Sequence, residues 1–284
     1  MRNYLTVTLR FLLFAYLLGN LAERKIMKTT KEILDALLSG VITKEEAEKI
    51  LSAERLTHLG EFAVIDQSRG ERSGVPEVIF AESKDAQTIS QIANSMASTN
   101  GFALISRADE NKVQVIEKNK GEHLIEVMGN SGMYTVLLYE KDWNPPTTTG
   151  KIAIITAGTS DIPYAKEVEA IAKVMGVDAL NFHDIGVAGI HRLVEPLRKI
   201  SSLDIDAIVV LAGMEGALPT VIASLVDIPV IGLPLPIGYG FRGKGEAALA
   251  AMLQSCAPGL AVVNIGNGIG AGSIACLIAK RAKK

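Results

Sequence analysis

Three segments of the chain combine glycine with polar side chains that could bind or transform a ligand. They are residues 158–161, 212–219 and 264–272, and each follows a strand-like apolar run and precedes a helical pattern. Glycine lets a backbone approach a ligand closely, and the first turn of a helix offers unpaired N–H groups to an anion. Because the carboxyl ends of parallel strands share one edge of a sheet, these junctions predict a nucleotide-sized site.

Cys256 is the residue best suited to covalent chemistry. The chain has two cysteines, too few for a disulfide framework, so a reducing compartment is the simpler interpretation. Cys276 lies inside an apolar run and is expected to be a buried small hydrophobe. Cys256 ends an amphipathic segment just before Pro258, where a reactive thiolate and a structural role both stay open.

The junctions also hold candidate acid–base and anion-binding groups. Glu215 lies between glycines at an expected helix start, where burial could tune its pKa, although helix-dipole stabilisation alone would also favour an acid there. His191 could exchange a proton or only cap a helix, and Arg192 could hold a carboxylate or phosphate through two hydrogen bonds. The polar groups at 158–161 fit N-capping as well as ligand contacts. The candidate ligand-binding residues are Gly158, Thr159, Ser160, Asp161, Arg192, Gly213, Met214, Gly216, Asn267 and Gly268.

The composition is that of a globular protein and argues against a nucleic-acid partner. Hydrophobic residues make up 48% of the 284 residues and charged residues 21%, which is enough for one large domain or two modest ones. The formal net charge is −2 and aromatic residues are 5% of the chain, so neither a basic footprint nor a base-stacking platform is expected.

The proline-containing segment 144–150 is the clearest linker, and a regular strand–helix alternation follows it. This pattern predicts an α/β domain over 151–284 with a parallel sheet and helices on both faces, the last helix starting near Ala271. The expected strands are 152–157, 178–183, 206–211, 229–233 and 260–265.

A smaller α+β domain is predicted over 27–145. A helical pattern over 31–38 ends at Gly40, and Thr43 with Glu46 forms a capping box for a second helix. A further helix is expected over 86–96. The expected strands are 62–65, 77–80, 102–105, 113–116, 123–127 and 134–138.

Residues 1–26 are expected to be an extension upstream of a start at Met27. The apolar block 11–18 behind Arg2 and Arg10 resembles a signal-peptide core, but it fits the cleavage rule poorly. The uncharged run, residues 11–22, is also shorter than the roughly 20 residues that a spanning helix needs. No membrane association is expected for residues 27–284.

Several motifs of the chain resemble those of known protein families. Gly-Thr-Ser-Asp at 158–161, Val-Ala-Gly-Ile-His-Arg at 187–192 and the segment 212–219 resemble the PurE superfamily of aminoimidazole ribonucleotide carboxylases and mutases. From Met27 onward the whole chain looks like the LarB family of nickel-pincer nucleotide carboxylase–hydrolases. Further segments that carry this likeness are 34–40, 45–48, 66–77, 255–257 and the final glycine-rich loop.

The resemblance implies a PurE-like, flavodoxin-like three-layer fold and an enzyme. It implies carboxylation of nicotinic acid adenine dinucleotide at C5 of the pyridinium ring, with CO2 or bicarbonate as co-substrate, and hydrolysis of the phosphoanhydride. The products would be pyridinium-3,5-biscarboxylic acid mononucleotide and AMP. It further implies a cytoplasmic homo-oligomer, expected to be an octamer, with no tightly bound cofactor; whether Mg²⁺ assists, and any metal ligands, stay open.

By the same resemblance, Cys256 would add to C4 of the ring, because a thiolate adds well and leaves again. Glu215 would remove the C5 proton, with His191 as a further catalytic group. A polar loop of the N-terminal domain would help to hold the dinucleotide; its candidate residues are Asp66, Arg69 and Arg72.

Two positions depart from the related patterns. The purine mutases carry a histidine where this chain has Ala217, which disfavours a carboxyaminoimidazole ribonucleotide mutase as the alternative function. The LarB-type Asn-Ile-Asp-Asn-Gly motif has Gly266 in place of its aspartate, which leaves room for a nucleotide-binding module without turnover.

Overall fold

The computed structural model describes residues 30–53, 56–59, 63–66 and 69–283, and these fall into two compact units, 1–55 and 56–284. The interpretations of residues 1–26 lie outside the described residues. Within the described part, no helix is long and apolar enough to cross a membrane.

The first unit contains the predicted helical hairpin. Helix α2 spans Thr30–Leu38 and α3 spans Lys44–Ala53, and Gly40 between them has the left-handed φ of +72° that a helix end requires. The capping box is confirmed: the N–H of Glu46 donates to Thr43 Oγ1 at 3.1 Å, and the N–H of Thr43 donates to Glu46 Oε2 at 3.0 Å.

The second unit begins with the two-stranded antiparallel sheet β1-β2 and continues with a four-stranded sheet in the order β3-β4-β6-β5. Alternate side chains of β4 and β6 face two different cores: Ile105 and Leu138 pack with α5 and α6, whereas Leu104 and Leu137 pack with α7 (Ile162–Met175). The elements of this region are β1 (Leu56–Leu59), β2 (Ala63–Asp66), α4 (Arg69–Ser73), β3 (Val78–Phe80), α5 (Ala86–Asn100), β4 (Phe102–Ala108), α6 (Glu110–Asn119), β5 (Leu124–Asn130) and β6 (Met133–Tyr139).

The strand predicted at 113–116 is wrong, because these residues form the middle of α6. Asp109 caps this helix by accepting a hydrogen bond from the N–H of Lys112, and Val113 and Ile116 lie three positions apart on one helical face. A short segment with three apolar residues among four does not distinguish a strand from a helix by periodicity alone.

The predicted parallel sheet is confirmed, with five strands in the order β11-β10-β9-β7-β8. The final strand ends at residue 262, earlier than expected, and the final helix begins at Gly268, three residues before the predicted start. The elements are β7 (Lys151–Thr156), η1 (Thr159–Asp161), α7 (Ile162–Met175), β8 (Asp178–Phe182), η2 (Val187–Leu193), α8 (Val194–Ser202), β9 (Ala207–Ala212), α9 (Ala217–Ala223), β10 (Val230–Pro234), α10 (Glu246–Leu253), β11 (Leu260–Val262) and α11 (Gly268–Ala282).

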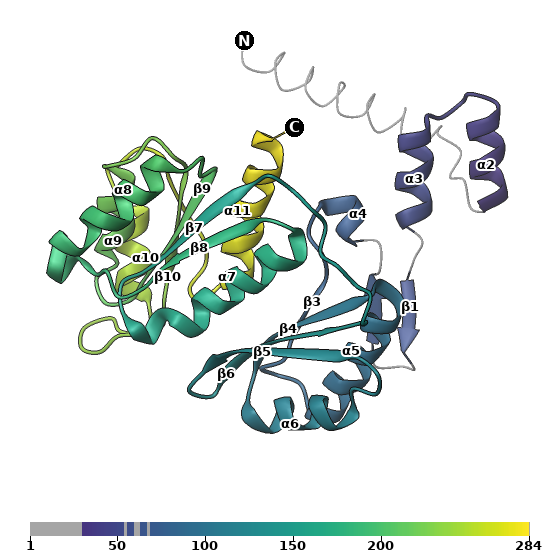
Figure 1. Cartoon of the computed structure of the whole chain (residues 1–284), viewed down its shortest axis with the longest axis horizontal. Helices are drawn as coiled ribbons and strands as arrows, with labels where there is room; N and C mark the ends of the chain where they lie inside the picture. The colour runs from purple at the N-terminus through teal and green to yellow at the C-terminus, as the bar shows by residue number, and fades with distance from the viewer. Residues whose placement is uncertain (1–29, 54–55, 60–62, 67–68, 284) are drawn as a thin grey trace, which may run out of the picture. The chain divides into compact units, whose positions relative to one another are not determined.

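Helices cover both faces of this sheet, which makes three layers (Figure 1). One core joins the sheet to α7 and α11, and the other joins it to α8, α9 and α10. The strand order reverses between β7 and β9. In sheets of this kind ligands bind beyond the carboxyl ends of the strands at such a switch point. A ligand site is therefore expected at the loops after β7 and β9.

Candidate functional site

The three glycine-rich segments lie at the carboxyl edge of the parallel sheet, as predicted. Backbone hydrogen bonds join neighbouring loops there: Ala157 donates to Leu211, Met214 donates to Ile237 at 3.2 Å, and the Gly266 N–H donates to the Pro234 carbonyl at 2.8 Å. The loops after β7 and β9 flank the switch point, while the loop after β11 meets the first turn of α7, where Gly266 approaches Tyr164.

The loop after β7 turns around the carboxylate of Asp161. The Gly158 N–H donates to Asp161 Oδ2 at 2.8 Å, and the Asp161 side chain is buried. Burial raises the pKa of Asp161 to about 6, against the lowering effect of hydrogen bonds from the loop backbone. Thr159 and Ser160 are exposed beside it. This loop can therefore offer hydroxyl groups and a carboxyl group that titrates near neutrality.

The loop after β9 depends on its glycines. A Cβ at Gly213 would lie 2.1 Å from the carbonyl oxygen of Ile237, and Gly216 has φ of +64° with Ala248 of α10 directly beside it. Met214 also has a positive φ, and both it and Glu215 are exposed. Glu215 is therefore not buried within this chain, contrary to the expectation for this position, and its carboxylate faces solvent.

The loop after β11 shows why glycine occupies position 266. Gly266 has φ of +68°, and a Cβ there would lie 3.2 Å from Arg107 Nη2 and 3.3 Å from the ring of Tyr164. A side chain at this position would be strained and crowded. Asn267 caps α11 by accepting from the Gly270 N–H at 2.9 Å, and Gly268 is buried against Glu167.

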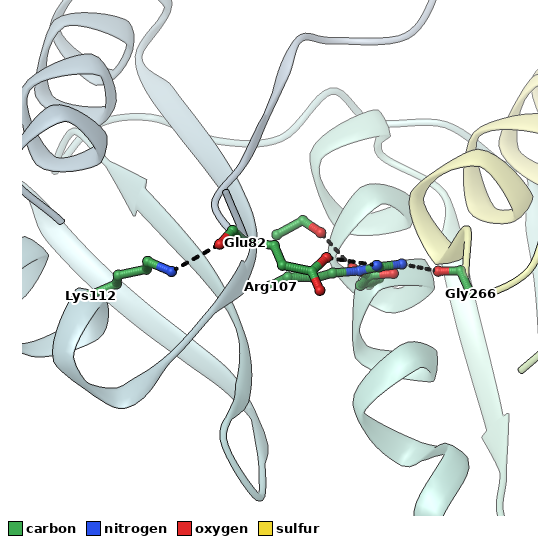
Figure 2. A network of polar contacts seen from close by, with 6 residues as sticks. Glu82, Arg107, Lys112 and Gly266 are labelled. Atoms are coloured by element: carbon green, nitrogen blue, oxygen red, sulfur yellow. Dashed lines mark hydrogen bonds and ion pairs between the residues drawn. The ribbon is translucent and has the colours of Figure 1, made fainter. Parts of the chain in front are cut away.

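A polar network that the sequence did not reveal joins the four-stranded sheet to this loop (Figure 2). The guanidinium of Arg107, on a β-bulge of β4, donates to the carboxylates of Glu82 and Glu167, each at 3.2 Å, and to the carbonyl of Gly266. It also lies 5.1 Å from the ring centroid of Phe80 and 5.7 Å from that of Tyr164. No spacing signal marks Arg107, because its partners are far apart in the sequence.

Glu167 is the buried member of this network. Burial raises its pKa, while the Ser106 hydroxyl and the Arg107 guanidinium, which both donate to Oε1, lower it. In the described part of the chain, Oε2 of Glu167 has no hydrogen-bond partner. The network thus fixes one oxygen of a buried carboxylate beside Gly268.

The loop after β8 holds the His191–Arg192 pair, and the two residues differ in their contacts. Arg192 folds back onto its own loop, with Nη1 donating to the Asp184 carbonyl at 2.6 Å and 3.2 Å from the Asp184 carboxylate. His191 is exposed in η2. His183, whose Nδ1 lies 3.3 Å from Thr156 Oγ1, was not among the predicted site residues; its place directly after β8 is a signal that could have identified it.

Cys256 does not join these loops within the chain. It is exposed in the segment between the end of α10 and the start of β11, where the Val230 N–H donates to the Gly259 carbonyl. This is the amino edge of the sheet, separated from the carboxyl edge by the eight residues of α10, roughly 12 Å. The predicted nucleophile and the predicted base thus lie at opposite edges.

The N-terminal candidates also lie away from the glycine-rich loops. Helix α4 carries Arg69, which is exposed. Its Gly70 and the Gly74 that follows the helix line a cavity with Met175 and Lys280, near the C-terminal ends of α7 and α11. Those helix ends belong to the amino edge. The Asp66 N–H donates to Glu77 Oε2 at 2.7 Å, and the side chain of Arg72 lies outside the described residues.

The described side chains include no group of three or more His, Cys, Asp or Glu residues arranged to hold a metal ion. The carboxyl edge instead offers hydroxyl groups, glycine backbone, the Asp161 carboxyl group and the Glu215 carboxylate. Such groups can bind sugar hydroxyls and phosphate oxygens and can move a proton.

The flavodoxin-like strand order and the glycine-rich loops at its switch point define a PurE-like α/β protein. The LarB/PurE-like N-terminal domain matches residues 56–128, and the AIR carboxylase domain matches residues 151–284. The chain belongs to the LarB family and carries a PurE-like AIR carboxylase domain.

Known proteins are similar to this chain over different shares of its length. An uncharacterized protein of Methanocaldococcus jannaschii is 40% identical over 259 residues, which are 89% of this chain and 98% of that protein. The N5-carboxyaminoimidazole ribonucleotide mutase of the same organism is 34% identical over 118 residues, 40% of this chain and 68% of the mutase. A crystal structure of a Treponema denticola PurE2 variant is 20% identical, with a TM-score of 0.37, over 49% of this chain and 80% of that one.

Proposed function

We propose that this protein carboxylates nicotinic acid adenine dinucleotide at C5 of its pyridinium ring and hydrolyses the phosphoanhydride. The products are pyridinium-3,5-biscarboxylic acid mononucleotide and AMP. The observation that carries the proposal is the match of both parts of the chain, the LarB-type N-terminal domain and the AIR carboxylase domain, in one polypeptide. The glycine-rich loops at the carboxyl edge support a nucleotide substrate.

The chemistry assigns one step to each reactive group. The Cys256 thiolate adds to C4 of the electron-poor ring, which turns the ring into a dihydropyridine with a nucleophilic C5. C5 then forms a bond to the carbon of CO2, Glu215 takes the C5 proton, and the thiolate leaves as the ring regains aromaticity. Water supplies the oxygen that splits the diphosphate into two monophosphates. Atoms and electrons balance without a redox partner.

A homo-oligomer is part of this proposal, because Glu215 and Cys256 lie at opposite edges of the sheet in one chain. A second copy that presents its amino edge to the carboxyl edge of the first would bring its Cys256 to the ring. It would also cover the exposed Glu215 and so give that carboxylate the burial that the single chain lacks. An octamer and a cytoplasmic, reducing setting that keeps the thiol free belong to the same proposal.

Two alternatives have distinct support. The mutase relatives favour purine chemistry, but Ala217 cannot transfer a proton. A nucleotide-binding module without turnover is favoured by Gly266, where LarB-type sequences have an aspartate; the crowding of position 266 by Arg107 and Tyr164 gives a structural reason for glycine instead.

The test is a mass-spectrometric assay of the purified full chain with nicotinic acid adenine dinucleotide and bicarbonate, with and without Mg²⁺. We expect AMP and the dicarboxylated mononucleotide from the wild type and neither product from Cys256→Ala, with Cys276→Ala as the matched control that stays active. Turnover of carboxyaminoimidazole ribonucleotide would support the mutase, and ligand binding without any product would support the binding module.

A further inference from the structure

A cleft lies beside the Thr159–Ser160 loop. It has a volume of about 590 Å³ and is formed between this loop with the start of α7 and the tip of the β5–β6 hairpin. The hairpin closes with Asn130 opposite Met133, and both residues of its two-residue turn have positive φ, +55° at Ser131 and +83° at Gly132. This is the turn geometry that matches the strand twist, so the tip is a defined structure.

The cleft is lined by neutral polar groups and by apolar side chains. The polar side chains are those of Asn130, Ser131, Thr159 and Ser160, and none of these four has a protein hydrogen-bond partner among the described residues. The other lining residues are Met133, Ile162, Pro163 and Tyr164. Hydroxyl and amide groups together with apolar side chains suit a ribose with an attached base, and the cleft contains no acidic or basic lining residue that would select an ion.

Polar contacts hold the two walls of the cleft together. Arg107 joins β4 to Glu167 of α7 and to the Gly266 carbonyl (Figure 2), and Glu126 of β5 pairs with Lys173 at the other end of α7. The Arg107 guanidinium also lies 5.7 Å from the ring centroid of Tyr164, which lines the cleft. Contacts near both ends of α7 therefore hold the four-stranded sheet against this helix. The cleft between the hairpin tip and the start of α7 thus has a defined shape.

We infer that this cleft binds the adenosine half of the dinucleotide, with the diphosphate across Thr159 and Ser160. The inference rests on the proposed function, which needs a two-nucleotide substrate. The nicotinate half belongs at the switch point beside Glu215, on the inner side of the same loop, so the second nucleoside extends outward past Ser160. The hairpin tip lies outside the AIR carboxylase match at 151–284. The N-terminal domain thus makes a dinucleotide site out of a mononucleotide site.

The test compares the binding of two probes, AMP and nicotinic acid mononucleotide, to the full chain by isothermal titration calorimetry. The double variant Asn130→Ala, Ser131→Gly removes two polar groups and keeps the turn, because glycine adopts the positive φ at 131. We expect its AMP affinity to fall about tenfold, as for two lost hydrogen bonds, while its affinity for the mononucleotide is unchanged. Met133→Trp, which fills the cleft, should abolish AMP binding.

Asn111→Ala is the matched control, since Asn111 is an exposed amide of the same domain outside the cleft. Equal AMP affinity in wild type and double variant, or an equal loss for both probes, would overturn the inference. The two proposals fail separately. A wild type that does not turn over the dinucleotide, with the AMP difference intact, refutes only the reaction; turnover with an unchanged KM in the double variant refutes only the cleft.

Discussion

The two edges of the parallel sheet differ in how they hold their functional candidates. At the carboxyl edge, loops are joined by backbone hydrogen bonds, several glycines have no room for a side chain, and Asp161 is buried. At the amino edge, Cys256 stands exposed in a short connection and Arg69 is exposed on α4. The first edge is a preorganised candidate binding surface, whereas the second presents reactive or charged groups outward. On the proposed function, a complete site therefore combines the two edges from two chains.

The sharpest test of this comparison, with the largest expected effect, mixes two inactive variants. Cys256→Ala and Glu215→Gln should each lower turnover by about 10⁴-fold, because each removes a group that acts in the chemical step. Oligomers assembled from a mixture of both should regain up to about a quarter of the wild-type sites if each site combines two chains. Turnover of the separately purified and the co-expressed variants measures this. No recovery in mixed oligomers would mean that the edges do not cooperate across chains.

The next test asks whether the glycines of the carboxyl edge serve packing or ligand approach. A Cβ at Gly268 would lie 2.5 Å from Glu167 Oε2 and 2.8 Å from the Tyr164 carbonyl oxygen, so Gly268→Ala should destabilise the protein by about 2–3 kcal/mol. Gly158 has open space around it and an ordinary extended backbone, so Gly158→Ala should leave stability within about 0.5 kcal/mol. Chemical denaturation gives both values. Equal losses in the two variants would contradict the packing argument.

The pH dependence of stability tests the buried carboxyl of this edge. Because the folded pKa of Asp161, about 6, lies above its ordinary value of 3.8, the folded protein binds the proton more tightly. Stability from this group is complete below pH 3.8 and falls as the pH rises through 6. Asp161→Asn should therefore stabilise the protein at pH 8 by about 2 kcal/mol and change little at pH 4. Denaturant midpoints of the wild type and the variant at both pH values measure this difference in stability. An effect of Asp161→Asn that does not depend on pH would refute the raised pKa of Asp161.

The two cysteines give the smallest expected effect and a direct contrast. Cys276 is fully buried in the core between α7 and α11, and burial raises the pKa of its thiol to about 12. Cys276→Ala should cost about 1 kcal/mol of stability and no activity. Cys256→Ala should cost no stability, since the thiol is exposed. Thermal unfolding of both variants provides the comparison, and a large loss for Cys256→Ala would argue for a structural role.

Local patterns predicted much of the fold because they act over a few residues. The alternation of apolar runs and helical patterns after residue 150 predicted the five strands to within a few residues, and Thr43 with Glu46 marked a real capping box. Val113–Ile116 was assigned wrongly, because two apolar residues three apart fit a helical face as well as a strand.

The long-range parts of the site had no such signal. Arg107 lies 60 positions before Glu167 and 159 before Gly266 in the sequence, and its side chain contacts both from the bulge in β4. The cleft between the β5–β6 hairpin and the Thr159–Ser160 loop likewise depends on how two sheets pack around α7.

The amino-acid sequence by itself determined the parallel α/β architecture, the three glycine-rich loops and the likeness to the LarB family, because these depend on periodicity and on short motifs. Only the tertiary structure decided which candidates meet. Strand direction sends the loops that begin at Gly158, Gly213 and Asn264 to one edge of the sheet, whereas α10 carries the chain back to the other edge before Cys256. Residue types specify the chemistry, but the direction of each strand and helix determines where it can take place.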